Sequence, residues 1–253
     1  MSSFLFIRHA QASYGAADYD QLSSKGYDQA SILGRALVAR GLTIDSVYVG
    51  PLKRQQQTLE KVREAYKEKG VPFPDDVVMK ELEEHRGPDI LKRSMASIVS
   101  EYDDIKKWEE ERQADATLTV KNGLLIFERA MTLWATGHLS HHQPDEYLDW
   151  QGFKKQVKSG FEMIYDRHKD EKGKTIALFT SGGTISAALG YLLGMQNDED
   201  IIGLNGIVQN TSISEFLFSG DRITMKRFND TSCLLYTSPS PRDATLSRMP
   251  SSA

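Results

Sequence analysis

A short apolar run near the N-terminus ends in two residues that could do chemistry. Residues 4–7 (Phe-Leu-Phe-Ile) predict a buried strand, and Arg8 and His9 follow it directly. In an open α/β sheet, ligands bind beyond the carboxyl ends of the strands. A neutral imidazole can act as a nucleophile toward phosphorus, and a neighbouring guanidinium can hold phosphoryl oxygens through paired hydrogen bonds. Taken alone, the pair is equally compatible with an ordinary polar strand end.

Three later segments place polar residues or glycines at the ends of predicted strands. They are Arg54 after the strand 44–49, Glu84 after the strand 77–82, and Ser181-Gly182-Gly183 at the end of the strand 174–181. The start of a helix presents unpaired N–H groups that favour an anion, and glycines let the backbone approach that anion closely. Each segment also has an ordinary interpretation, as a solvated arginine or a plain strand-to-helix turn. Together they supply the nucleophile, carboxylate and oxyanion donors that phosphoryl transfer through a phosphohistidine needs.

The elements that must position these residues alternate between strands and helices. Helical periodicity follows the first two strands, dominates residues 89–168, and returns after Gly183. A hairpin pattern over 212–228 closes the chain. This order predicts an α/β fold: a three-layer α/β/α sandwich with a mostly parallel mixed sheet. We expect one domain over 1–231, in which residues 89–170 form a helical insert that covers the site.

Composition excludes several classes of function. The chain has 253 residues, and its net charge of -4 gives no reason to expect nucleic acid or an anionic membrane as a partner. No apolar run approaches the ~20 residues that span a bilayer, and the N-terminus lacks the pattern of a signal peptide. Cys233 is the only cysteine, which excludes an internal disulfide framework. We therefore expect a cytoplasmic protein; the sequence carries no indication of its oligomeric state.

The last segment, residues 232–253, differs in character from the rest of the chain. It is rich in serine and proline, lacks periodicity, and resembles a translated vector or adapter sequence. A natural disordered tail is the alternative. We expect this segment to carry no chemistry and to dock nowhere on the core; if it is a read-through, the true C-terminus is missing.

Three histidines around a predicted break, His138, His141 and His142, raise the question of a metal site. A polar loop before Pro144 is the simpler interpretation, because no carboxylate or cysteine partner has suitable spacing. We therefore expect neither a metal nor another cofactor.

The ordered motifs resemble those of the histidine phosphatase superfamily, the phosphoglycerate mutase-like proteins. The resemblance spans roughly residues 4–231. The segments that carry it are Leu5-Phe6-Ile7-Arg8-His9-Ala10, Leu52-Lys53-Arg54-Gln55-Gln56-Gln57-Thr58, Leu82-Glu83-Glu84 followed by Gly87, Asn210-Thr211-Ser212-Ile213, and Phe228-Asn229-Asp230.

The resemblance implies a role for each matched residue. His9 is the phosphorylated nucleophile, Arg8 and Arg54 bind phosphate, and Glu84 is the proton donor. The implied activity is hydrolysis of a small phosphorylated substrate, a phosphomonoester, through a phosphohistidine. A phosphomutase, which must keep water from the phosphoenzyme, is one alternative. A degenerate protein that binds a phosphorylated ligand without turnover is another.

One position departs from the family pattern. The family usually reads Ser-His-Gly-Gly where this chain has Thr180-Ser181-Gly182-Gly183, so Ser181 stands where a second histidine is expected. A serine hydroxyl can donate a hydrogen bond but cannot carry charge, and losing such a donor typically costs ~10²–10³ in rate. If the pocket has the family geometry, Ser181→His should raise the rate. Two alternatives remain: surroundings adapted to serine, or a replacement by His85, His138, His141 or His142.

Overall fold

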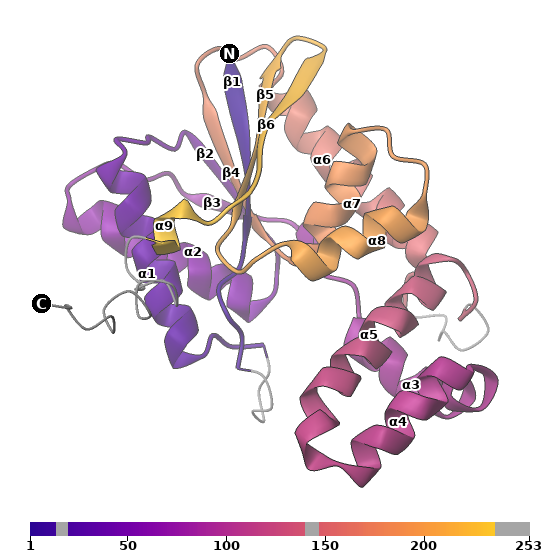
Figure 1. Ribbon diagram of the computed structural model, residues 1–253. Coiled ribbons are helices and arrows are strands. Elements are labelled where there is room, and N and C mark those ends of the chain that lie inside the picture. Colours follow the sequence, from indigo (N-terminus) through magenta and orange to yellow (C-terminus); the bar gives the residue numbers. More distant parts are fainter. Residues whose placement is uncertain (14–19, 140–146, 236–253) are drawn as a thin grey trace, which may run out of the picture. The chain divides into compact units, whose positions relative to one another are not determined.

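The computed structural model describes residues 1–13, 20–139 and 147–235 (Figure 1). These residues divide into two compact units. The first contains Met1–Glu83, Asp166–Ser181 and the chain from Gln209 onward, and the second contains Glu84–Tyr165 and Gly182–Val208. The first unit carries a six-stranded sheet, and the second is built from helices. The α/β class expected from the sequence is confirmed.

The sheet of the first unit has the strand order β3-β2-β4-β1-β5-β6. Its strands are β1 (Ser2–Arg8), β2 (Ser46–Val49), β3 (Asp76–Val78), β4 (Thr175–Thr180), β5 (Ile213–Ser219) and β6 (Arg222–Asp230). The first four strands in this order pair in parallel, whereas β5 and β6 add to β1 as an antiparallel hairpin. The predicted mostly parallel mixed sheet is therefore confirmed.

Strand β1 is buried on both faces, as its continuous apolar run predicts. Leu5 and Ile7 belong to the main hydrophobic cluster on one face. On the opposite face, the Phe4 ring stacks on Phe218 with centroids 4.3 Å apart, and the Phe6 ring meets Phe216 edge to face at 5.9 Å. Alternation along a strand sends successive side chains to opposite faces, so one short run contributes to both layers of contacts.

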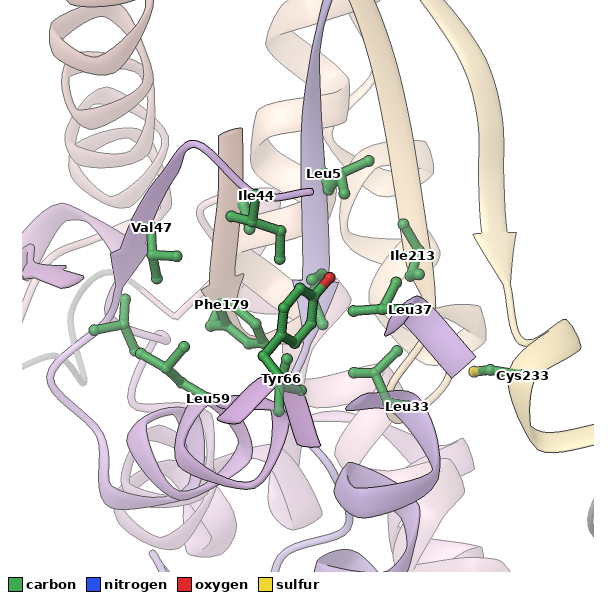
Figure 2. Close-up of a cluster of buried hydrophobic side chains, with 14 residues drawn as sticks. Leu5, Leu33, Leu37, Ile44, Val47, Leu59, Tyr66, Phe179, Ile213 and Cys233 are labelled. Carbon is green, nitrogen blue, oxygen red and sulfur yellow. The ribbon is translucent and has the colours of Figure 1, made fainter. Parts of the chain in front are cut away.

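Two helices cover one face of the sheet. They are α1 (Ser24–Ala39), whose first turn is capped by the Ser23 hydroxyl, and α2 (Lys53–Glu68). Figure 2 shows leucines of α1 and α2 and the ring of Tyr66 directed at strand residues such as Leu5 and Phe179. Burial of these side chains contributes roughly 1.5–3 kcal/mol each to folding, which fixes α2 against the sheet and, with it, the residues at its start.

The short helix α9 (Ser232–Leu235) corrects the expectation that nothing after residue 231 docks on the core. Cys233 is buried in the main cluster (Figure 2). Leu234 packs against the same cluster. Arg40 Nη2 donates to the Ser232 hydroxyl at 2.7 Å. Four residues are too few for a periodic pattern, which is why no sequence pattern predicts this helix. Residues 236–253 lie outside the described part of the chain.

The edge strand β3 is shorter than predicted. A strand was expected over 77–82, but β3 ends at Val78 and residues Lys80–Leu82 form a single 3₁₀ turn, η1. The ladder with β2 ends where Met79 N–H donates to the Val49 carbonyl at 2.8 Å. Leu82 then buries its side chain, 2% exposed, whereas Val77 and Val78 are 44% and 54% exposed. The apolar residues of this segment therefore have two different environments: Val77 and Val78 are exposed on the edge strand, whereas Leu82 is buried.

The second unit confirms the helical pattern predicted for residues 89–168. Its helices are α3 (Gly87–Glu101), α4 (Asp103–Ala114), the 3₁₀ turn η2 (Ala116–Leu118), α5 (Thr119–Ala135), the first part of α6 (Trp150–His168), α7 (Gly182–Leu192) and α8 (Asp198–Ile207). Helix α8 was not predicted, because only Ile201 and Ile202 of its residues are buried. Among the helices of the described ranges, none is long and apolar enough to cross a bilayer.

The close contact of α1 with α2 generates a stability prediction. A Cβ on Gly34 would lie 2.8 Å from the Ala65 Cβ and 2.9 Å from the Val62 Cα. Gly34→Ala should therefore lower the free energy of unfolding by about 1 kcal/mol, since overpacking of ~1–3 kcal/mol exceeds the helix-propensity gain. Urea denaturation measures this, with the exposed Arg35→Ala on the same helix as control. A more stable Gly34→Ala would refute the tight contact.

Candidate active site

The imidazole of His9 is fixed in one tautomer. His9 follows β1 and is nearly buried, and its backbone N–H donates to the Thr180 carbonyl at 2.9 Å. Its Nδ1 lies 2.7 Å from the Ala10 carbonyl oxygen. A carbonyl can only accept, so Nδ1 carries the proton. The other ring nitrogen, Nε2, therefore carries no proton. Its lone pair accepts a hydrogen bond from Arg54 Nε–H at 3.1 Å.

The surroundings of His9 disfavour its charged form. Burial lowers the pKa of the imidazole well below its ordinary 6.5, and the positive charges of Arg54 and Arg8 lower it further. The hydrogen bond to Ala10 opposes this shift of the pKa but does not outweigh it. At neutral pH the side chain is therefore a neutral imidazole with an available lone pair, which is the nucleophilic form.

The start of α2 already accommodates a carboxylate. Arg54 lies in the first turn of α2 and is largely buried, 8% exposed. Its Nη1 donates to Asp20 Oδ1 at 2.7 Å, and Lys53 N–H donates to Asp20 Oδ2 at 2.9 Å. A guanidinium and a helix-start amide thus converge on one anionic group, as expected for an oxyanion site. Asp20 lies in the polar loop that follows Ala10, and no spacing rule singles it out.

A network of hydrogen bonds holds the Arg8-His9 backbone. The Thr58 hydroxyl accepts from Ala10 N–H at 3.0 Å and donates to the Arg54 carbonyl at 2.7 Å, which ties α2 to the end of β1. The amide of Asn210 donates to the His9 carbonyl at 3.0 Å, and Thr211 N–H donates to the Arg8 carbonyl at 3.0 Å. The late motif that contains Asn210 therefore supports the strand end that carries His9.

Ser181 lies in the first unit, as His9 does, and it is completely buried. Its hydroxyl oxygen accepts from Gln55 Nε2 at 2.8 Å. The same nitrogen donates to the Leu82 carbonyl at 3.1 Å, and Gln55 Oε1 accepts from Leu52 N–H at 3.1 Å. Both the oxygen and the nitrogen of the Gln55 side-chain amide are thus hydrogen-bonded, and Ser181 is one of the partners. Sequence reasoning missed Gln55, although its place beside Arg54 was a signal.

Glu84 and Gly182 belong to the second unit. Glu84 Oε2 accepts from Gly183 N–H at the start of α7 at 2.9 Å, and Oε1 accepts from His85 N–H at 2.9 Å. The carboxylate side chain is 14% exposed. Gly182 is buried as the first residue of α7. A carboxylate on the first turn of a helix is favourably placed for its charge.

The structure thus groups the predicted residues in two sets. His9, Arg8 and Arg54 come together in the first unit, which also contains Ser181. Glu84 and Gly182 lie in the second, where Glu84 contacts Gly183, the residue that follows Gly182. Of the histidines considered for a metal, His138 bonds its Nδ1 to the Thr136 hydroxyl at 2.8 Å, and the other two lie outside the described residues.

Comparison with protein families gives one match. The model of the histidine phosphatase superfamily (branch 1) matches residues 4–148 and 126–231, which together span nearly all of the chain before the final segment. No curated protein matches the sequence.

Solved structures share the fold at low sequence identity. YhfR of Bacillus stearothermophilus is 17% identical with a TM-score of 0.63, covering 92% of this chain and 100% of that protein. A mutant phosphoserine phosphatase of Entamoeba histolytica, in complex with phosphoserine, is 16% identical with a TM-score of 0.56, covering 93% and 100%. A mycobacterial glucosyl-3-phosphoglycerate phosphatase is 16% identical with a TM-score of 0.57, covering 90% and 98%.

The buried, neutral His9 generates a prediction on pH. Below its ordinary pKa of 6.5, the unfolded chain binds a proton at His9 that the folded chain does not bind. Stability from this group is therefore complete above about pH 6.5 and is lost as pH falls, by up to about 1.4 kcal/mol per pH unit. The difference in unfolding free energy between wild type and His9→Asn, from urea titrations at several pH values, should follow this course. Parallel curves would contradict it.

The contacts of Ser181 change the expectation for Ser181→His. An imidazole must displace the Gln55 amide from a fully buried position, so the surroundings are adapted to serine. We now expect Ser181→His to lose about 1–3 kcal/mol of stability by overpacking and to gain no rate. Thermal or urea unfolding measures the loss, and Ser24→His at the exposed start of α1 is the control, expected within about 0.5 kcal/mol of wild type. A faster and equally stable Ser181→His would restore the first expectation.

Proposed function

Since the chain belongs to the histidine phosphatase superfamily, we propose that it hydrolyses a phosphomonoester through a phosphohistidine on His9. One observation carries the proposal: the His9 imidazole is neutral, with Nδ1–H bonded to Ala10 and the Nε2 lone pair directed at Arg54. A packing histidine has no need of two arginines beside it. A nucleophile for a phosphate ester does, because they stabilise the transferring oxygens.

In the first step, His9 Nε2 attacks phosphorus and the bond from phosphorus to the ester oxygen breaks. Arg54 and Arg8 stabilise the negative charge on the phosphoryl oxygens. The Nδ1–H bond to the Ala10 carbonyl supports the positive charge that the ring acquires. Glu84, in its protonated form, gives its proton to the leaving alcohol oxygen.

In the second step, water attacks the phosphohistidine. The Glu84 carboxylate accepts a proton from the water, the nitrogen–phosphorus bond breaks, and inorganic phosphate leaves. His9 returns to the neutral tautomer, and Glu84 is protonated again for the next cycle. In this scheme the arginines supply the charge stabilisation that a metal ion supplies in other phosphatases, so we propose metal-independent catalysis.

Ser181 supports a second candidate of a different class. A protein that binds a phosphorylated ligand and turns it over negligibly needs the arginines but not a second imidazole, and Ser181 with its Gln55 partner offers none. Formation of the phosphoenzyme separates the two candidates. A phosphomutase would also form it, but would pass the phosphoryl group to a second hydroxyl and not to water.

The substrate and the place of action are further proposals. We assign the choice of substrate to the helical residues 89–170. Phosphoserine and 3-phosphoglycerate are the first esters to test, because related folds were crystallised with them. The single cysteine is consistent with a reducing cytoplasm.

The prediction that tests the proposal is an acid-labile, base-stable phosphoenzyme. Rapid mixing with a ³²P-labelled ester that wild type hydrolyses, followed by an alkaline quench, should leave label on the protein. Peptide mapping should place the label on His9. His9→Ala should form no phosphoenzyme and lose at least ~10³ in rate, while circular dichroism and melting at pH 7 remain near those of wild type. Label on another residue, or a His9→Ala rate within about tenfold of wild type, would rule out the assignment.

A further inference from the structure

The imidazole of His85 is held in a defined orientation within the second unit. Its side chain is 4% exposed. The ring lies against Trp134 and Phe153, with centroid distances of 5.1 Å and 5.5 Å. Gly87 N–H donates to Nδ1 at 3.1 Å. A ring nitrogen that accepts a hydrogen bond carries no proton, so the neutral imidazole has its proton on Nε2.

The Nε2 of His85 lies next to the carboxyl group of Glu84. Nε2 lies 3.5 Å from Glu84 Oε1, at the outer limit of hydrogen-bond distance. The side-chain nitrogen of Asn205, a donor, also lies 3.5 Å from Nε2, but the shorter 3.1 Å bond from Gly87 N–H to Nδ1 sets the tautomer and leaves the proton on Nε2. The backbone N–H of His85 also donates to Oε1, and Gly183 N–H donates to Oε2. Two backbone N–H groups therefore donate to a largely buried carboxyl group, and the imidazole Nε2 lies beside it at 3.5 Å; such donors are what a buried charge requires.

Gly183 provides an independent observation that this cluster is built for close approach. A Cβ at position 183 would lie 2.3 Å from Glu84 Oε1 and 2.4 Å from the Cδ2 of His85. Both contacts are far inside van der Waals distance. Only glycine therefore lets the carboxyl group and the imidazole rest together on the first turn of α7.

We propose that His85 is a positioning residue for the proton donor Glu84, an inference that rests on the proposed function. As Glu84 gives its proton to the leaving oxygen, it acquires a negative charge. The Nε2–H of His85 and the Gly183 amide stabilise this charge and hold the carboxyl group in one orientation. His85 supplies the imidazole N–H through Glu84, without contacting the substrate.

The test compares two esters that differ in their need for a proton. Phenolate is a poor leaving group, with a conjugate acid of pKa ~10 as for tyrosine, whereas 2,4-dinitrophenolate leaves without protonation. For phenyl phosphate, Glu84→Gln should lower kcat/KM by about 10²–10⁴; for 2,4-dinitrophenyl phosphate the loss should stay below about tenfold. A variant that impairs positioning should show the same dependence on the leaving group.

Two amide substitutions separate the roles of the two ring nitrogens. His85→Asn keeps an acceptor for Gly87 N–H but loses the donor at Nε2, so kcat/KM for phenyl phosphate should fall about tenfold, with little change for the dinitrophenyl ester. His85→Gln places its amide nitrogen near the original Nε2 and should stay close to wild type. Both substitutions remove the ring contacts with Trp134 and Phe153, so a packing role would affect both variants and both esters equally, which would overturn the inference.

Further controls separate the inference from the proposed function. If wild type hydrolyses neither ester, or Glu84→Gln shows no dependence on the leaving group, the proposed role of Glu84 fails and the inference with it. If Glu84→Gln shows that dependence and His85→Asn does not, only the inference fails.

If the His85 variants do not fold, Gly183→Ala replaces them in the test. Gly183→Ala should lose activity mainly on phenyl phosphate. Gly203→Ala, where the added Cβ would have no neighbouring atom within 4 Å, should keep its activity on both esters. Equal loss on both esters would count against the inference.

Discussion

The hydrogen bond between His9 Nδ1 and the Ala10 carbonyl is the interaction on which the rest of the site depends. It assigns the single proton of a neutral imidazole to one nitrogen and leaves a lone pair on the other. Burial and two nearby guanidinium groups hold the pKa of the ring well below its ordinary value. The charged ring would be costly in that place, so the fold itself selects the nucleophilic form. In the proposed function, a bound phosphoryl group would relieve the constraint, because it would bring negative charge to the arginines.

The parallel register of the sheet explains why these groups meet. Arg8 pairs with Thr180 in the parallel strands β1 and β4. The residues that follow, His9 and Ser181, therefore lie together at the carboxyl ends of these two strands. Helix α2 is fixed against the adjoining strands by its apolar face, and its first turn brings Arg54 to His9. None of these placements needs a long-range charge interaction. They follow from hydrophobic burial and from strand pairing, and the polar contacts then adjust the chemistry.

The sequence predicted what local patterns specify and missed what depends on tertiary contacts. An apolar run cut off by Arg8 and His9 marks a strand end, and the family motifs singled out Arg54, which the structure places in hydrogen-bond contact with His9. The hydrogen bond that makes Ser181 part of a fixed network comes from Gln55, 126 residues earlier in the chain, and no periodicity reports it. The same holds for α9, whose four residues dock through one buried cysteine. The surroundings of His85 could not be predicted either, because its ring contacts come from separate helices such as α5 and α6.

The proposed chemistry requires that His9 be a neutral imidazole with its proton on Nδ1. Long-range ¹H–¹⁵N NMR of protein labelled with ¹⁵N-histidine measures this directly at pH 7, with His9→Asn used to assign the signals. We expect one protonated ring nitrogen, Nδ1, and an unprotonated Nε2 whose ¹⁵N signal shifts when phosphate is added. An imidazolium at pH 7, or a proton on Nε2, would contradict it.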